Sequence, residues 1–123
     1  NHPKNLFVAN FLGTINAIKG KISNGTFSDG NNFKLENLKG NNADHCSLLV
    51  RPQNIYFEKK NDNEQNFKGK IQSKEFLGNI IRYQVLISGQ VLTIDSMHEG
   101  KEKIYSKNED VDVFINPETS QII

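Results

Sequence analysis

The sequence predicts a small, mostly β protein that folds as an antiparallel barrel or sandwich. Short runs of alternating apolar and polar residues recur along most of the chain, which is typical of half-buried strands. Glycine, asparagine and proline separate these runs at short intervals and predict turns. No strand–helix–strand pattern is present, so a parallel sheet is not expected. The 123 residues fit one domain.

A short helix is expected at the start of the chain. Pro3 suits the first helical turn, and Leu6, Phe7 and Phe11 fall at helical spacing. Gly13 follows them and is typical of a helix end. Because so short a helix is unstable alone, its apolar face must dock on another surface.

Strands and turns follow as far as residue 50. The segment 14–23 alternates, but its phase changes between Ala17 and Ile18, which predicts a bulge there. Asn24-Gly25 predicts a hairpin turn. The other elements expected in this half are short strands at 26–28 and 32–35, a turn at Asp29-Gly30, a loop at 36–44 and a buried strand at 45–50.

The run Leu48-Leu49-Val50-Arg51-Pro52 predicts a corner at the middle of the chain. Three apolar residues indicate a buried strand, and Pro52 ends it because proline fixes φ and lacks a backbone donor. Arg51 then lies at the end of a buried strand. We expect its guanidinium to bind carbonyl oxygens or a carboxylate, so that this corner links two halves of one β structure.

The second half of the chain predicts longer strands. Residues 58–65 are almost all charged or amide-bearing and predict a solvated loop. The elements expected after it are strands at 67–77, 80–87, 91–95 and 111–115, turns at Gly78-Asn79, Ser88-Gly89 and 116–118, a charged loop at 97–110, and an edge strand at 122–123.

Composition limits the classes of function. A hydrophobic content of 36% and a charged content of 24% suit a soluble globular domain. The formal charge of +1 is too balanced for a strong electrostatic hold on nucleic acid or an anionic membrane. One cysteine excludes an internal disulfide and suits a reducing compartment. The start at Asn1, without Met, suggests a segment of a longer polypeptide.

Several segments together resemble a known family. The segments are 3–13, Val50-Arg51-Pro52-Gln53-Asn54-Ile55, 67–85, and Gly89 with 111–118. The chain resembles the C-terminal regulatory region of the ATP-binding subunit of bacterial ABC importers, in the branch that serves ferric iron, polyamines and sugars. One departure is Gln53, where the family usually has Glu. The family positions that this chain matches are Arg51, Pro52, Gly69, Gly78, Arg82, Tyr83 and Gly89.

The resemblance implies an OB-like TOBE domain at 14–123, preceded by a helix at 1–13 that leaves an absent nucleotide-binding domain. It implies an accessory role in a homodimer of ATPase subunits coupled to membrane permeases, on the cytoplasmic side of the plasma membrane. Leu6, Phe7 and Phe11 are then candidate interface residues. The chain lacks a Gly-x-x-x-x-Gly-Lys-Ser/Thr loop, so we expect no catalysis and no ATP or Mg²⁺ site within it.

Chemical sites within this chain have weaker support. His45 and Cys46 are adjacent on an expected strand, so they point to opposite faces and cannot easily share a metal ion with His98. Nothing near Cys46 indicates an activated thiolate. The acidic residues Asp95, Glu99 and Glu102 fit a solvated hairpin end better than an acid–base set.

Nucleic-acid binding is the main alternative function. Lysines interleaved with aromatic residues are typical of proteins that bind single strands. Lysine at alternate positions is also the ordinary solvent face of a barrel, and the balanced charge favours that interpretation. The residues concerned are Lys19, Lys21, Lys68, Lys70 and Lys74, with Phe67 and Phe76.

Overall fold

The computed structural model describes residues 14–123, and within them it contains ten strands and two short 3₁₀ helices. All the strand pairs are antiparallel, as the sequence predicts. The expected helix with Leu6, Phe7 and Phe11 lies outside the described residues. The elements are β1 (Asn16–Ser23), β2 (Thr26–Ser28), β3 (Lys34–Leu35), β4 (Ala43–Val50), η1 (Pro52–Asn54), β5 (Ile55–Tyr56), β6 (Gln65–Leu77), β7 (Ile80–Ile87), β8 (Gln90–Met97), β9 (Asp110–Ile115), η2 (Pro117–Thr119) and β10 (Gln121–Ile122).

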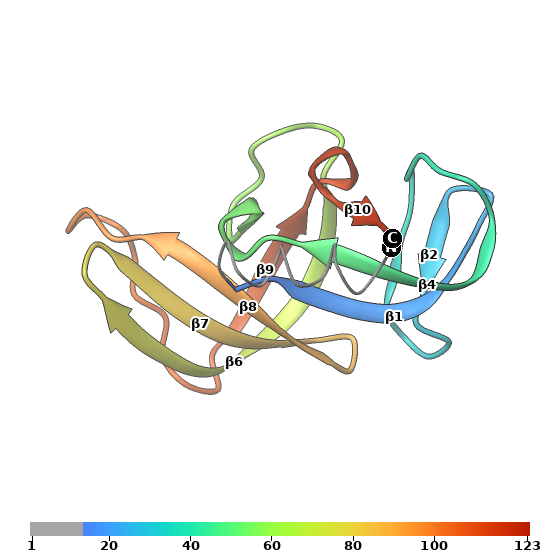
Figure 1. Cartoon of the computed structure of the whole chain (residues 1–123). Helices are drawn as coiled ribbons and strands as arrows, with labels where there is room; N and C mark the ends of the chain where they lie inside the picture. The colour runs from blue at the N-terminus through green and yellow to red at the C-terminus, as the bar shows by residue number, and fades with distance from the viewer. Residues whose placement is uncertain (1–13) are drawn as a thin grey trace.

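The strands form two five-stranded sheets. The first has the order β10-β4-β1-β2-β3, and the second has the order β5-β9-β6-β7-β8. In Figure 1 the first sheet occupies the right half of the molecule and the long β6–β7–β8 meander the left half. The last strand, β10, returns to pair with β4, so the end of the described chain completes the first sheet.

The second sheet curls into a nearly closed barrel. Its two edge strands, β5 and β8, contact each other without hydrogen-bonding as neighbours, and η1 packs along β8 between them. The fold class predicted from the sequence, a small antiparallel β-barrel, is therefore confirmed.

One hydrophobic core joins the two sheets. It includes Ile18 and Phe27 from the first sheet together with Tyr83 and Val113 from the second. Three phenylalanines lie at its centre, where Phe33 stacks on Phe67 at 5.1 Å between ring centroids and meets Phe27 edge-on. Residues 14–47 thus belong to the same folding unit as the rest of the described chain.

The hairpin turns that glycine and asparagine predicted are found at the predicted positions. Asn24-Gly25 and Ser88-Gly89 each have two successive positive φ angles and close tight hairpins. Gly78-Asn79 closes the β6–β7 hairpin, with a positive φ at the glycine. These two-residue turns set the register of every strand that they join.

The predicted bulge in the first strand is in a different place. The register of β1 against β4 shifts between Gly20 and Ile22, not between Ala17 and Ile18. Asn16, Ile18 and Ile22 face the core, and Ala17 is exposed, so the phase is continuous across the predicted position. The bulge was misplaced because asparagine is a polar residue, and its polarity gave no sign that Asn16 faces the core.

The strand before Pro52 is buried only in its second half. Leu48, Leu49 and Val50 are buried, whereas Asp44 and His45 are exposed. The chain then leaves the strand at Arg51 and enters η1 at Pro52, as predicted. The carbonyl of Arg51 accepts a hydrogen bond from the backbone N–H of Asn54, which closes the corner.

Candidate functional site

An asparagine side chain bridges the seam between β1 of the first sheet and the free edge of β8 in the second. The Nδ2 atom of Asn16, at the start of β1, donates to the Thr93 carbonyl at 2.8 Å, and the Asn16 Oδ1 atom accepts from the Thr93 N–H at 2.8 Å. The amide thereby occupies both backbone groups of Thr93 on the free edge of β8, as a neighbouring strand would. Asn16 is buried, so both bonds lie away from bulk solvent.

A cavity of about 840 Å³ lies beside this seam. Its lining residues come from Thr14, the corner, β5 and the residues after it, and from β7, β8 and the charged loop that follows β8. Its lining mixes aromatic, apolar and charged side chains. The lining residues used below are Arg51, Tyr56, Phe57, Ile80, Arg82, Asp95, Met97, Lys101 and Tyr105.

An ion pair forms part of the cavity wall. The Arg82 guanidinium donates from Nε to Asp95 Oδ1 at 2.8 Å and from Nη2 to Asp95 Oδ2 at 2.9 Å. The Asp95 side chain is only 10% exposed, and the hydrogen bonds to it raise the pKa of Arg82. The expectation of a solvated Asp95 is therefore wrong, whereas Glu99 and Glu102 are exposed as expected.

The partner of Arg82 could have been found from the sequence. A two-residue turn at Ser88-Gly89 pairs Ile87 with Gln90, and counting back along both strands places Arg82 opposite Asp95. A cross-strand pair of opposite charge is a common stabilising contact in antiparallel sheets. No pattern in the sequence marks Asn16 in the same way.

The aromatic rings of Phe57, Tyr83 and Tyr105 pack against one another beside the cavity. The ring of Phe57 lies edge-on to Tyr83 at 5.2 Å and 4.5 Å from Tyr105. The Tyr83 hydroxyl oxygen accepts the backbone N–H of Tyr105 at 3.1 Å and so fixes the charged loop to β7. Burial raises the pKa values of Tyr83 and Tyr105, so both phenols are neutral at physiological pH.

The corner arginine lines the same cavity. The Arg51 side chain is half-buried, and no described residue from 14 to 123 forms a hydrogen bond or ion pair with its guanidinium. The partner that the sequence led us to expect is not found in that part of the chain. Its assignment as a structural residue remains a prediction.

The matched glycines have separate structural reasons. Gly69 lies where β6 crosses the core, and a Cβ atom there would be 2.8 Å from Val85 Cγ1. Gly78 and Gly89 have φ angles of 67° and 87°, which a side chain would strain. These positions shape the barrel and its hairpins, whereas only Arg51 and Arg82 of the matched set line the cavity.

His45 and Cys46 are consecutive residues of β4 and differ in exposure. His45 is exposed, and the adjacent Cys46 is half-buried against the core. Burial raises the pKa of the Cys46 thiol, which opposes thiolate formation. Within residues 14–123 no group of three His, Cys, Asp or Glu side chains could hold a metal ion.

Three of the five lysines that suggested nucleic-acid binding form ion pairs or hydrogen bonds with other residues. Lys68 pairs with Asp112, and Lys70 pairs with Asp110 at 3.0 Å on the neighbouring strand. Lys74 donates to the Tyr105 carbonyl. Phe67 is 7% exposed and belongs to the core, so no base could stack on it. Phe76, the other aromatic residue of this group, is 55% exposed, but the three lysines on its strand are engaged by Asp112, Asp110 and the Tyr105 carbonyl.

The comparison with family models agrees with this geometry. The TOBE domain model matches residues 48–123, from the buried half of β4 to the end of the chain. The chain belongs to the TOBE domain family. As a TOBE domain it is an accessory, non-catalytic domain. No curated protein matches the chain.

The matched segment includes the whole of the second sheet and every residue that lines the cavity except Thr14. The resemblance noted from the sequence extended over nearly the whole chain. Strands β1–β3 lie before the match, yet β1 pairs with β4, β2 with β1 and β3 with β2, and all three contribute residues to the common core. No helix among residues 14–123 is long and apolar enough to cross a membrane.

Proposed function

We propose that this TOBE domain is the regulatory domain of the ATP-binding subunit of an ABC importer, of the type that serves ferric iron, polyamines or sugars. Membership of the TOBE family over residues 48–123 is the observation that carries the proposal. The order of the matched segments, from the Val-Arg-Pro corner to Val111–Glu118, supports it. In this role the domain binds and positions other parts of a transporter and performs no chemistry.

The proposed partners follow from that role. They are the nucleotide-binding domain of the same polypeptide, a second copy of the subunit, and the permease subunits of the transporter. The domain would lie in the cytoplasm at the inner face of the plasma membrane, held there by the complex. ATP and Mg²⁺ would bind the nucleotide-binding domain, and Leu6, Phe7 and Phe11 remain candidate interface residues.

A nucleic-acid-binding barrel remains the alternative, and the structure weighs against it. The acidic residues of β9 neutralise Lys68 and Lys70, and Phe67 is buried. A protein that held single strands would need free cations along an exposed aromatic face.

Two measurements on the purified 123-residue chain test the proposal, and the second of them separates it from the alternative. We expect no ATP turnover above a contaminant control, because the chain has no phosphate loop. We also expect no change in the fluorescence anisotropy of a labelled single-stranded oligonucleotide at low salt. Salt-sensitive oligonucleotide binding that is lost in Lys19→Glu/Lys21→Glu would favour the alternative and contradict the proposal.

A further inference from the structure

The corner fixes the position of Arg51 at the lining of the cavity. Its backbone is extended, with φ −72° and ψ 139°, and the next residue, Pro52, is buried. The Arg51 carbonyl accepts the Asn54 N–H at 2.9 Å, which restrains the chain that follows. Within residues 14–123 the guanidinium of this half-buried residue has no hydrogen-bond or ion-pair partner. A cation that is half removed from water and unpaired in this way can bind an anion strongly.

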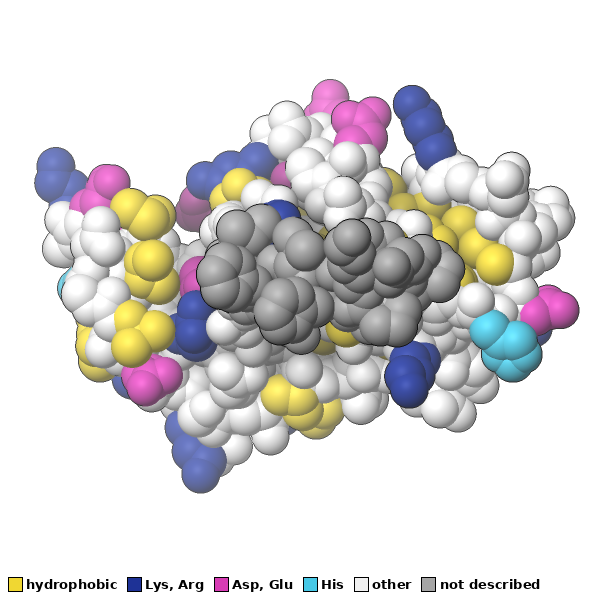
Figure 2. All heavy atoms as spheres, viewed as in Figure 1, with side chains coloured by type: hydrophobic (Ala, Val, Ile, Leu, Met, Phe, Trp, Pro, Cys, Tyr) yellow, Lys and Arg dark blue, Asp and Glu magenta, His cyan; other side chains and the backbone are white. Residues whose placement is uncertain are grey.

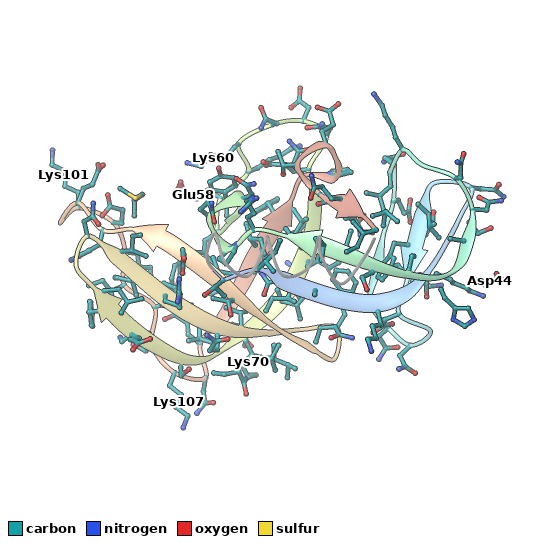
Figure 3. All side chains as sticks on the ribbon, viewed as in Figure 1. Asp44, Glu58, Lys60, Lys70, Lys101 and Lys107 are labelled. Carbon is teal, nitrogen blue, oxygen red and sulfur yellow. The ribbon has the colours of Figure 1, made fainter. Side chains whose placement is uncertain are left out.

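The other charges that line the cavity are paired or exposed. Arg82 and Asp95, both half-buried, neutralise each other. The remaining six are exposed and balanced in sign, so solvent and salt screen them. They are Glu58, Lys60, Glu99, Lys101, Glu102 and Lys103. Figure 3 shows Glu58 and Lys60 near the middle of the molecule and Lys101 at its left end. Among residues 14–123, Arg51 is therefore the half-buried charge of the lining that lacks a partner.

Aromatic and apolar side chains provide the rest of the lining. Tyr56, Phe57 and Tyr105 line the cavity and are only half-buried. Ile80 and Met97 add apolar surface. Figure 2 shows hydrophobic side chains beside basic and acidic ones in the left part of the molecule, where Figure 1 places β7 and β8. Aromatic rings with accessible surface bind flat apolar groups, because contact removes both surfaces from water.

The free edge of β8 provides backbone donors in the same lining. Thr93 directs its N–H group away from β7, because that group donates to Asn16. Backbone groups alternate in direction along a strand, so Asp95 and Met97 direct their N–H groups the same way. No strand pairs with this edge, and both residues line the cavity. Their N–H groups are further donors for an anionic ligand.

From these features we infer that the cavity is a binding site for a small organic carboxylate with an aromatic body. The carboxylate pairs with the Arg51 guanidinium, and the aromatic body packs against Tyr56, Phe57 and Tyr105. The volume of about 840 Å³ falls within the range of about 300–1,000 Å³ that is typical of small-molecule sites. The inference goes beyond the proposed role in a transporter and does not depend on it.

An NMR titration of the full 123-residue chain with naphthoate tests the inference, and the neutral naphthamide is the matched probe. We expect naphthoate to shift the amide resonances of Asp95, Met97 and Tyr105 saturably, with a dissociation constant of about 1 mM or less. Naphthamide has the same rings but no charge, so it should bind at least about tenfold more weakly. Equal binding of the two probes, or no saturable shift up to about 10 mM, would overturn the inference.

Substitutions of single cations give a second test. Arg51→Gln should weaken naphthoate binding at least about tenfold and change naphthamide binding less than about twofold, because only the carboxylate uses the guanidinium. Arg51→Lys keeps the charge and should restore part of the affinity. Lys107→Gln removes an exposed cation outside the cavity, at the lower side of the molecule in Figure 3, and should change neither constant. Unchanged naphthoate binding in Arg51→Gln would contradict the assignment.

The positions of the shifted resonances test the site without any substitution. A second cavity of about 660 Å³ is lined by other residues, among them Lys19, Cys46 and Ser47. Shifts of the wild-type chain that centre on these residues would place the carboxylate elsewhere and overturn the inference. Circular dichroism verifies that Arg51→Gln is folded. If it is not, the comparison of the two probes and the positions of the shifts in the wild type decide the question.

Discussion

At the scale of single residues, two polar side chains join neighbouring strands by side-chain hydrogen bonds: Asn16 joins β1 to the free edge of β8, and Asp95 joins β8 to β7. Asn16 satisfies both free backbone groups of Thr93, and Asp95 neutralises Arg82 at the edge of the cavity. Polarity in the sequence predicted exposure for Asp95, and the structure shows the reverse. Buried polar groups are tolerated when they are fully paired, and pairing across strands depends on the register.

Replacing Asn16 with alanine should destabilise the fold. The substitution leaves the Thr93 N–H and carbonyl without partners in a half-buried seam, so we expect a loss of about 1–3 kcal/mol in the free energy of unfolding. Urea denaturation followed by circular dichroism measures it. Asn41→Ala, in an exposed loop, is the control and should change the free energy by less than about 0.5 kcal/mol. An equal effect of the two substitutions would show that Asn16 does not bridge the seam.

At the scale of secondary structure, the sequence predicted the longer strands and the hairpins well. Gly and Asn at the turns fix backbone angles that few other residues adopt, so Asn24-Gly25 and Ser88-Gly89 identified their hairpins directly. The bulge of β1 was misplaced because Asn16 faces inward. The cavity could not be predicted, because it depends on how closely β5 approaches β8 in space.

The charged loop after β8 is fastened by Glu109. Its Oε1 atom accepts the Ser106 N–H at 3.0 Å, and Oε2 pairs with Lys103. The bond from Lys103, followed by that from Ser106, lowers the pKa of Glu109 below its ordinary value of 4.5. A carboxylate whose pKa is lower in the folded state stabilises the fold above the ordinary value and loses that effect as the pH falls below it.

Glu109→Gln should therefore have an effect that depends on pH. We expect a lower thermal midpoint than the wild type at pH 7, and a difference that shrinks as the pH falls through the lowered pKa of Glu109 and the wild-type carboxylate becomes protonated. Thermal denaturation at a series of pH values measures it. A difference that stays constant or grows toward acid pH would contradict this assignment. Glu118→Gln, on an exposed turn, serves as the control.

At the scale of the whole molecule, the family match and the folding unit have different limits. The TOBE model begins at Leu48, whereas β1 pairs along β4, and Ile18, Phe27 and Phe33 complete the core beneath it. The early strands are therefore part of the domain in structural terms. Alternating residues and turn residues predicted these strands, but nothing in the sequence indicated which strands they would pair with.

A chain limited to residues 48–123 should not fold on its own. It would lose β1 as the partner of β4 and expose the apolar faces of Leu48 and Phe67 to water. We expect no cooperative thermal transition for 48–123, in contrast to a single transition for 14–123, measured by circular dichroism. A cooperative transition in the shorter chain would show that the first three strands are an addition to an independent unit.

The central claim is that this TOBE domain is the regulatory part of a transporter ATPase, and the coding sequence before residue 1 tests it most directly. We predict that the same open reading frame encodes a nucleotide-binding domain upstream, with a Gly-x-x-x-x-Gly-Lys-Ser/Thr phosphate loop. A start codon immediately before Asn1, or an upstream domain of another class, would contradict the claim.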